Sequence, residues 1–239
     1  RLARIIGKNA EADKYDAMAS ESAAAWTEKF LDKESGKVGE GTQSAQCFAL
    51  GYGAASEEAR KAVFDFLVKD LTAPEDSPRL TTGIFATQIL LEQLSKNGRS
   101  DLAYGLANRE TFPSWKWMLK NGATTLWEHW EQEENTYSHN HPMFGSISGW
   151  FFRWLGGIQC APDAVAFDRI LIRPQTVEGL DWVKTSHETV RGTIVSNWKK
   201  DGDAYEFEIT IPPGAMATVE LPVGQGDTVT ESGRPLSEH

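Results

Sequence analysis

The chain has 239 residues, of which 40% are hydrophobic and 10% aromatic, enough for one or two domains with well-filled cores. Its formal net charge of −10 argues against binding to nucleic acid, because a phosphate backbone is recognised by clustered Lys and Arg. No apolar run approaches the ~20 residues of a membrane span, so we expect no membrane partner. The sequence opens at Arg1 without an initiator Met, so the absence of a targeting signal leaves the compartment open.

Helix signals dominate the first two thirds of the chain. Residues 9–33 carry apolar side chains at three- and four-residue spacing, and Gly36 follows as a stop signal. The segment 56–71 predicts a helix whose inner face is Val63, Phe64, Leu67 and Leu71. Further helices are predicted over 42–54, 82–94, 100–108, 113–121 and 144–155. Helices joined by loops, with no strand between them, favour paired helices in a toroid or bundle.

After Pro162 the hydrophobic period becomes two. Runs that alternate or are β-branched lie at 167–172, 181–190, 193–198, 205–211 and 218–221. The pair Asp201-Gly202 between two such runs is a strong hairpin signal. Short strands at this spacing predict an all-β sandwich. We therefore predict a mainly α fold with a C-terminal all-β domain, divided into residues 1–160 and 161–239.

The region 111–154 holds six of the nine Trp and three of the five His. Aromatic faces suit the apolar C–H face of a pyranose ring, and carboxylates beside them supply acid, base and hydroxyl-binding groups. The pattern therefore indicates a carbohydrate site. Trp150 and Trp154, four residues apart in an apolar helix, fit core packing better, as does Trp117. Trp115 and Trp127 stand at element ends, where a pocket wall and the core are equally compatible.

Metal and thiol chemistry receive little support. His139 and His141 are two residues apart, with no third ligand at an obvious spacing, so we expect neither a metal nor a cofactor. A histidine that hydrogen-bonds a substrate hydroxyl is the better interpretation. Cys47 and Cys160 have no ligand-like neighbours and are interpreted as two buried free thiols.

Glu128 differs from the other acidic residues of this region. It ends a Gly-led, β-branched stretch that starts at Gly122, and Trp127 and Trp130 flank it. A carboxylate in a partly apolar pocket has a raised pKa, which suits a general base. Composition alone leaves both a catalytic and a structural role open.

Five sequence blocks, in this order and spacing, resemble the bacterial α-L-rhamnosidases of glycoside hydrolase family 78 over residues 1 to about 225. The blocks are LTTGIF (80–85), NGRSDLAY (97–104), FPSW (112–115), GATTLWE (122–128) and NHPMFGS (140–146). The resemblance implies an (α/α)6 barrel, of which this chain holds roughly the second half, followed by an antiparallel β-sandwich.

The same resemblance implies a reaction and its residues. The family hydrolyses glycosides with inversion at the anomeric carbon, so a rhamnose-containing glycoside, from plants or polysaccharides, is the expected partner. Glu128 is similar to the family's general base, and His141 to a rhamnose-contacting residue. Trp115 and Trp127 are candidates for the sugar-binding wall.

Two departures from the family pattern stand out. Ala86-Thr87 replaces the family's usual Gly-Thr. The family's general acid lies in an Asp- and Arg-rich stretch near the start of the barrel, and this sequence contains no such stretch. We therefore expect the 239-residue chain alone to hydrolyse nothing and to need the missing N-terminal barrel segment as a partner. A half barrel would also expose a helix face that is otherwise covered.

Two other functions stay open. One is a non-catalytic carbohydrate-binding or structural module with Trp182 and Trp198 as its aromatic platform, although their alternation with polar neighbours fits core packing better. The other is a different (α/α)6 carbohydrate-active enzyme that still requires Glu128.

Overall fold

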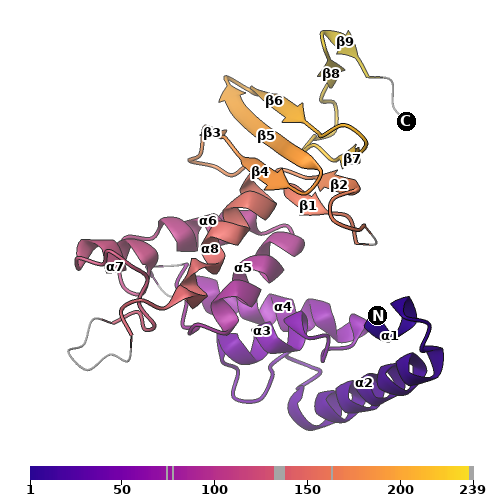
Figure 1. The fold of residues 1–239 in the computed structure, drawn as a ribbon. Helices are drawn as coiled ribbons and strands as arrows, with labels where there is room; N and C mark the ends of the chain where they lie inside the picture. The colour runs from indigo at the N-terminus through magenta and orange to yellow at the C-terminus, as the bar shows by residue number, and fades with distance from the viewer. Residues whose placement is uncertain (74, 77, 132–137, 163, 237–239) are drawn as a thin grey trace. The chain divides into compact units, whose positions relative to one another are not determined.

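A computed structural model describes residues 1–73, 75–76, 78–131, 138–162 and 164–236. The chain divides into two compact units, Arg1–Ser148 and Gly149–His239 (Figure 1). The first is helical and the second is mainly β. The predicted class, helices followed by a β domain, is therefore confirmed.

The helical unit follows the predicted order of helices, with a short extra helix at the start. The helices are α1 (Leu2–Ile5), α2 (Asn9–Phe30), α3 (Gln43–Gly51), α4 (Glu57–Thr72), α5 (Ala86–Lys96), α6 (Ser100–Asn108), α7 (Trp115–Lys120), the 3-10 helix η1 (Pro142–Gly145) and α8 (Ser146–Trp150). The predicted inner face of α4 is buried along its length. Helix α3 packs against both α4 and α5, and α5 packs against α6. Leu90, Leu91 and Leu94 of α5 are fully buried, so α5 lies at the centre of this core.

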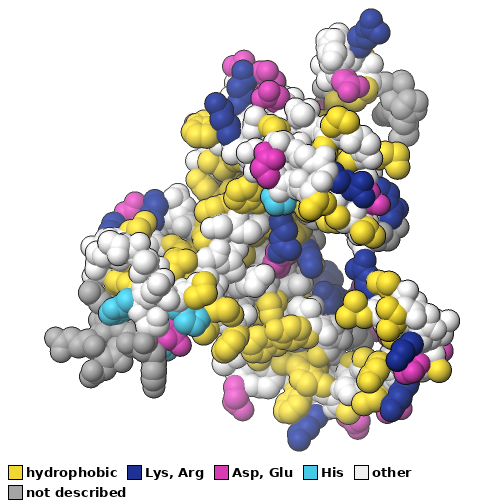
Figure 2. Space-filling view, in the orientation of Figure 1, with side chains coloured by type: hydrophobic (Ala, Val, Ile, Leu, Met, Phe, Trp, Pro, Cys, Tyr) yellow, Lys and Arg dark blue, Asp and Glu magenta, His cyan; other side chains and the backbone are white. Residues whose placement is uncertain are grey.

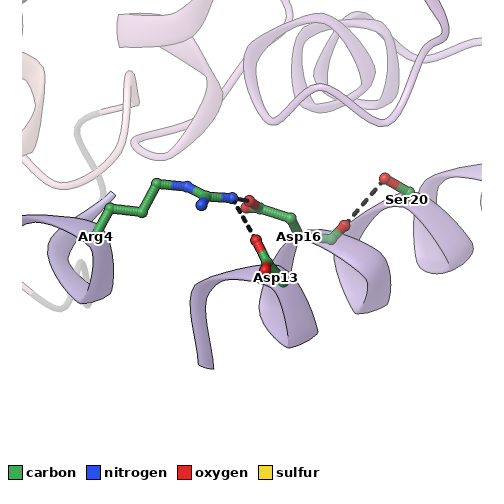
Figure 3. A network of polar contacts seen from close by, with 4 residues as sticks. All are labelled: Arg4, Asp13, Asp16 and Ser20. Carbon is green, nitrogen blue, oxygen red and sulfur yellow. Dashed lines mark hydrogen bonds and ion pairs between the residues drawn. The ribbon is translucent and has the colours of Figure 1, made fainter. Parts of the chain in front are cut away.

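Helix α1 is joined to α2 by one guanidinium. Arg4 donates from Nη2 to Asp13 Oδ1 at 3.0 Å and to Asp16 Oδ2 at 2.6 Å, while Ser20 Oγ donates to the Asp16 carbonyl at 3.0 Å (Figure 3). The hydrogen bonds that Arg4 donates to Asp16 and Asp13 raise the pKa of Arg4. All these groups are well exposed, so the ion pairs contribute little stability and mainly set the direction of α1.

Helix α5 begins at Ala86, four residues later than the sequence predicts. The Thr82 carbonyl accepts a hydrogen bond from Trp130 Nε1 at 2.8 Å, and the Thr82 hydroxyl bonds that of Thr87 at 2.8 Å. Tertiary hydrogen bonds therefore hold residues 82–85 outside the helix.

The β unit is a sandwich of two sheets, with a separate two-stranded sheet formed by its last two strands. Its strands are β1 (Ile158–Cys160), β2 (Arg169–Ile172), β3 (Trp182–Val183), β4 (Ser186–Thr189), β5 (Gly192–Asp201), β6 (Ala204–Thr210), β7 (Met216–Val219), β8 (Thr230–Glu231) and β9 (Arg234–Pro235). One sheet has the order β1-β2-β7, and in the other β5 pairs with β3 and β4 along one edge and with β6 along the opposite edge. Ile158, Ile170, Ile172 and Ile194 form the core between them. The pairings are antiparallel except for β2 with β7, which is parallel, so the predicted antiparallel sandwich has one departure.

Several local predictions for this unit are wrong. The run 181–190 is two strands, because Thr185 is buried between them and its N–H donates to the Asn197 side chain at 2.9 Å. Trp198 is in the core as predicted, donating to the Leu155 carbonyl at 2.8 Å, whereas Trp182 is 60% exposed. The expected last helix is interrupted, since its final turn, η2 (Phe151–Leu155), is a π-helix.

The two cysteines are both free thiols, but they differ in environment. Cys47 is buried in α3, and burial raises the pKa of its thiol to about 12. Cys160, at the end of β1, is exposed, so the prediction of two buried thiols holds for Cys47 alone. In the part of the chain that the structure describes, no helix is long and apolar enough to cross a membrane.

Candidate active site

A cavity of about 700 Å³ opens in the helical unit, where the first turns of α3 and α5 meet two loops. Four of the five recognised sequence blocks contribute to its wall. The lining residues are Ser44 and Phe48 from α3, residues 79–81 and 83–86, Phe112 and Pro113, residues 128–131, and Phe144. The block NGRSDLAY contributes none and instead forms the α5–α6 junction, where the Arg99 guanidinium holds the pKa of Asp101 below its usual range.

Trp130 fixes one wall of the cavity. Its ring stacks on Phe144 with centroids 3.8 Å apart, and its indole nitrogen donates to the Thr82 carbonyl. Trp115 stands edge-on to Trp130 at 5.1 Å and donates from Nε1 to the Phe144 carbonyl at 3.0 Å. Three buried aromatic rings thus tie the segment around residue 130 to the start of α5 and to η1.

The opposite wall is held by a buried amide. Gln43, 2% exposed, donates from Nε2 to the Arg79 carbonyl at 3.0 Å and to Asp70 Oδ2 at 2.9 Å. Its Oε1 accepts from the Thr81 N–H at 2.7 Å. This network fixes residues 79–81 in their non-helical path and so presents Arg79 to the cavity.

Glu128 lines the cavity and is half-buried. Its N–H donates to the Ser138 carbonyl at 3.0 Å, and the Leu126 carbonyl accepts from the His141 N–H at 2.8 Å. Thr125 Oγ1 also donates to the His139 carbonyl. The loop segments 125–128 and 138–141 are therefore hydrogen-bonded to each other, which fixes the backbone at Glu128 and before it.

His141 begins η1 and is oriented by it. Its Nδ1 accepts from the Met143 N–H at 3.4 Å, which assigns the proton of the neutral ring to Nε2 and makes that atom a hydrogen-bond donor. His141 is half-buried and is not among the residues that line the cavity. Histidine side chains reach the surface of the helical unit on the side where α7 lies (Figure 2).

The two tryptophans that the sequence left between pocket and core are both buried. Trp115 is 8% exposed and Trp127 4%, and neither lines the cavity. Trp127 lies beside the His139 ring, with centroids 5.5 Å apart. Trp115 stands behind Trp130 and Phe144, which line the cavity, whereas Trp127 packs beside His139, directly before Glu128.

Sequence reasoning missed several cavity residues. Arg79, Phe85, His129 and Glu131 lie within or next to the recognised blocks, so their adjacency was an available signal. The sequence gives no signal for Ser44 and Phe48, because only the packing of α3 on α5 brings them to the cavity. Within the described ranges, no three His, Cys, Asp or Glu side chains gather to hold a metal ion.

Comparison with known proteins places the chain in a family. Residues 1–155 match the model of the bacterial α-L-rhamnosidase six-hairpin glycosidase domain, and residues 157–235 match that of the bacterial α-L-rhamnosidase C-terminal domain. The chain belongs to the bacterial α-L-rhamnosidase family. Its cavity lies in the six-hairpin part, which in this family precedes the C-terminal domain.

Individual members of the α-L-rhamnosidase family agree in sequence and fold. A relative named α-L-rhamnosidase from Formosa agariphila is 28% identical over 241 residues, covering 96% of this chain but 25% of the relative. The solved α-L-rhamnosidase of Dictyoglumus thermophilum superposes with a TM-score of 0.90 at 29% identity, over 100% of this chain and 27% of that structure. That of Streptomyces avermitilis, complexed with L-rhamnose, gives 0.84 at 29% identity over 92% and 21%. The chain thus spans about a quarter of the length of these rhamnosidases.

The two family models meet between residues 155 and 157, whereas the compact units divide after Ser148. The difference concerns η2, which hydrogen-bonds to the β unit through the Trp154 and Leu155 carbonyls. A domain boundary at residue 160 stays a prediction.

Proposed function

We propose that this chain supplies the general base of an inverting α-L-rhamnosidase that releases terminal α-L-rhamnose from plant glycosides or polysaccharides. The observation that carries the proposal is Glu128, a half-buried carboxylate on the wall of an aromatic-lined cavity. Aromatic and apolar walls suit the C–H face and the methyl group of a 6-deoxyhexose.

In the proposed reaction the Glu128 carboxylate takes a proton from a water molecule. The water oxygen attacks the anomeric carbon from the face opposite the leaving group, and the glycosidic C–O bond breaks. A carboxylic acid elsewhere in the family's barrel protonates the departing oxygen. The two carboxyl groups of inverting enzymes are about 6.5–9.5 Å apart, which leaves room for the water.

The remaining predicted residues take supporting roles. His141 accepts the Met143 N–H at Nδ1, which leaves its Nε2 to donate to a rhamnose hydroxyl. Trp115 and Trp127 support the residues of the cavity wall and do not contact the sugar themselves, because their rings are buried. Each assignment is a proposal for this chain and rests on the resemblance together with these contacts.

We further propose that the 239-residue chain is inactive by itself, because it carries no counterpart of the Asp- and Arg-rich stretch that holds the family's acid. Turnover of 4-nitrophenyl α-L-rhamnopyranoside by this chain, abolished by Glu128→Gln, would contradict that expectation.

The test of Glu128 uses a polypeptide that contains the whole six-hairpin domain. Glu128→Gln should lower kcat on 4-nitrophenyl α-L-rhamnopyranoside by about 10²–10⁴-fold, because it removes the proton acceptor while keeping the shape. Proton NMR of the first turnover should show β-L-rhamnose, the inverted anomer. In Glu128→Ala, azide should restore release of nitrophenol and yield the β-rhamnosyl azide.

The matched control is Glu131→Gln, which neutralises a second carboxylate on the same cavity wall. We expect it to change kcat by much less. If Glu131→Gln costs as much as Glu128→Gln, or if the first product is the α anomer, the assignment of Glu128 is wrong.

A further inference from the structure

The outer face of the four-stranded sheet carries one exposed aromatic side chain. Along β5, Ile194, Ser196 and Trp198 are buried, so the alternate residues point outward. The register places Trp182 opposite Lys199, and Lys199 opposite Glu206, in one row across three strands. Trp182 is 60% exposed, in contrast to buried Trp198 one strand away.

Hydrogen-bonding groups surround this indole. Lys199 Nζ lies 2.7 Å from Glu206 Oε2, and in the next row Asn197 Nδ2 donates to Glu208 Oε2 at 2.9 Å. Neighbouring strands are about 4.8 Å apart and rows about 7 Å apart, so these groups lie within one sugar residue of Trp182. Ammonium, amide and carboxylate groups can all bond to hydroxyls.

Hydrogen bonds hold the backbone on both sides of Trp182. The Lys200 N–H donates to the Asp181 carbonyl at 2.7 Å, and Val183 faces inward opposite Trp198. The Thr185 N–H is bonded to the Asn197 side chain just after β3. A fixed strand backbone keeps the Trp182 position on the outer face, so ligand binding requires no change of the strand itself.

We propose that this face, centred on Trp182, binds an uncharged glycan by stacking a pyranose ring on the indole. The outward positions carry Glu188, Glu206 and Glu208 against Lys199, so an anionic polysaccharide would be repelled. A protein partner would need a broader apolar patch, whereas Val195 is half-buried and Trp182 is the large apolar side chain that projects from these strands. The site is separate from the cavity of the helical unit and does not depend on the proposed hydrolysis.

The experiment is affinity electrophoresis of the 239-residue chain in native gels. The gels contain glucomannan, xyloglucan, dextran or an uncharged rhamnan, with polygalacturonate as the anionic comparison. At least one uncharged polymer should retard the chain, and Trp182→Ala should weaken that binding about tenfold or more. Trp182→Phe, which keeps an aromatic face, should retain part of it.

Two controls separate this site from other causes of retardation. Val190→Ala, which trims an even more exposed apolar side chain in the β4–β5 turn, should bind as the parent does. Glu128→Gln should also bind normally, which separates this site from the proposed active site. No retardation by any uncharged polymer, equal retardation of Trp182→Ala, or retardation by polygalacturonate alone would overturn the proposal. So would sedimentation that shows self-association of the chain relieved by Trp182→Ala in place of glycan binding.

Discussion

At the scale of single residues, Trp130 makes two kinds of contact at the cavity. Its ring packs on Phe144 and Trp115, and its nitrogen satisfies the buried Thr82 carbonyl. Trp130→Phe keeps an aromatic ring but leaves that carbonyl only the longer hydrogen bond from Thr87 Oγ1, at 3.4 Å. We expect the free energy of unfolding to fall by about 1–3 kcal/mol, measured by denaturant titration followed by far-UV circular dichroism.

The control for Trp130 is the same substitution at the exposed Trp182, which should stay within about 0.5 kcal/mol of the parent. If Trp130→Phe is equally neutral, the indole hydrogen bond does not hold the start of α5 to the cavity wall.

Trp182 is exposed and Trp198 is buried, a difference that the sequence around each residue does not predict. Both sit in β-branched, polar-alternating runs, so their surroundings in the sequence look alike. Period-two alternation assigns faces within one strand, but it does not say which face of a short edge strand is covered. The strand register decides which face is covered: Val183 lies opposite buried Trp198, so Val183 faces the core and Trp182 faces outward.

At the scale of elements, Gly157 links η2 to β1 in a conformation that other residues rarely adopt. Its φ is +77°, and a Cβ there would lie 2.2 Å from the Pro174 nitrogen, a backbone atom that cannot move aside. Gly157→Ala should therefore destabilise the β unit by more than about 2 kcal/mol, seen as a lower thermal midpoint of that unit.

Gly202 provides the matched control for Gly157. It lies in the β5–β6 hairpin with φ +61°, and a Cβ added there would meet no atom within 4 Å. Gly202→Ala should therefore carry only the backbone cost of about 1–2 kcal/mol. Equal losses from the two alanine substitutions would show that the approach of Pro174 to Gly157 is not the cause.

The elements themselves were largely predictable, and their ends were not. Helix α6 has the predicted limits, and α4 buries the predicted face, because hydrophobic period is a local signal. The start of α5 and the break between β3 and β4 depend on Trp130 and on Asn197, which are distant in sequence. Such tertiary hydrogen bonds override local propensity.

The candidate site was also predictable where its residues belong to local sequence patterns, and not where it depends on tertiary contacts. The recognised blocks contain most of the cavity wall, including Glu128, because each block is a loop with its own short-range pattern. Gln43 is outside every block, yet its amide fixes residues 79–81. Its role depends on the tertiary packing that brings α3 beside residues 79–81.

At the scale of the whole molecule, the helical unit leaves much apolar surface exposed at its N-terminal end. Helix α2 has a single buried residue, Ala12, whereas Tyr15 is 62% and Met18 51% exposed. Leu2, Ile5 and Ile6 are each at least 67% exposed. Figure 2 shows hydrophobic side chains along α1 and α2. Contiguous apolar surface of this kind is normally covered by another part of the protein or by a partner.

We propose that further chain of a six-hairpin barrel covers this face, since the chain spans about a quarter of the length of the relatives it matches. The 239-residue chain should then enhance the fluorescence of 8-anilinonaphthalene-1-sulfonate, because the dye binds exposed apolar surface. A polypeptide with the whole six-hairpin domain should not. The double substitution Ile5→Ser with Met18→Lys should lower the signal of the short chain. Val190→Ser, which removes an 88% exposed side chain of the β unit, should leave the signal unchanged. Equal dye binding by the short and long polypeptides would mean that α1 and α2 stay uncovered, and the proposed partner segment would then have to pack elsewhere.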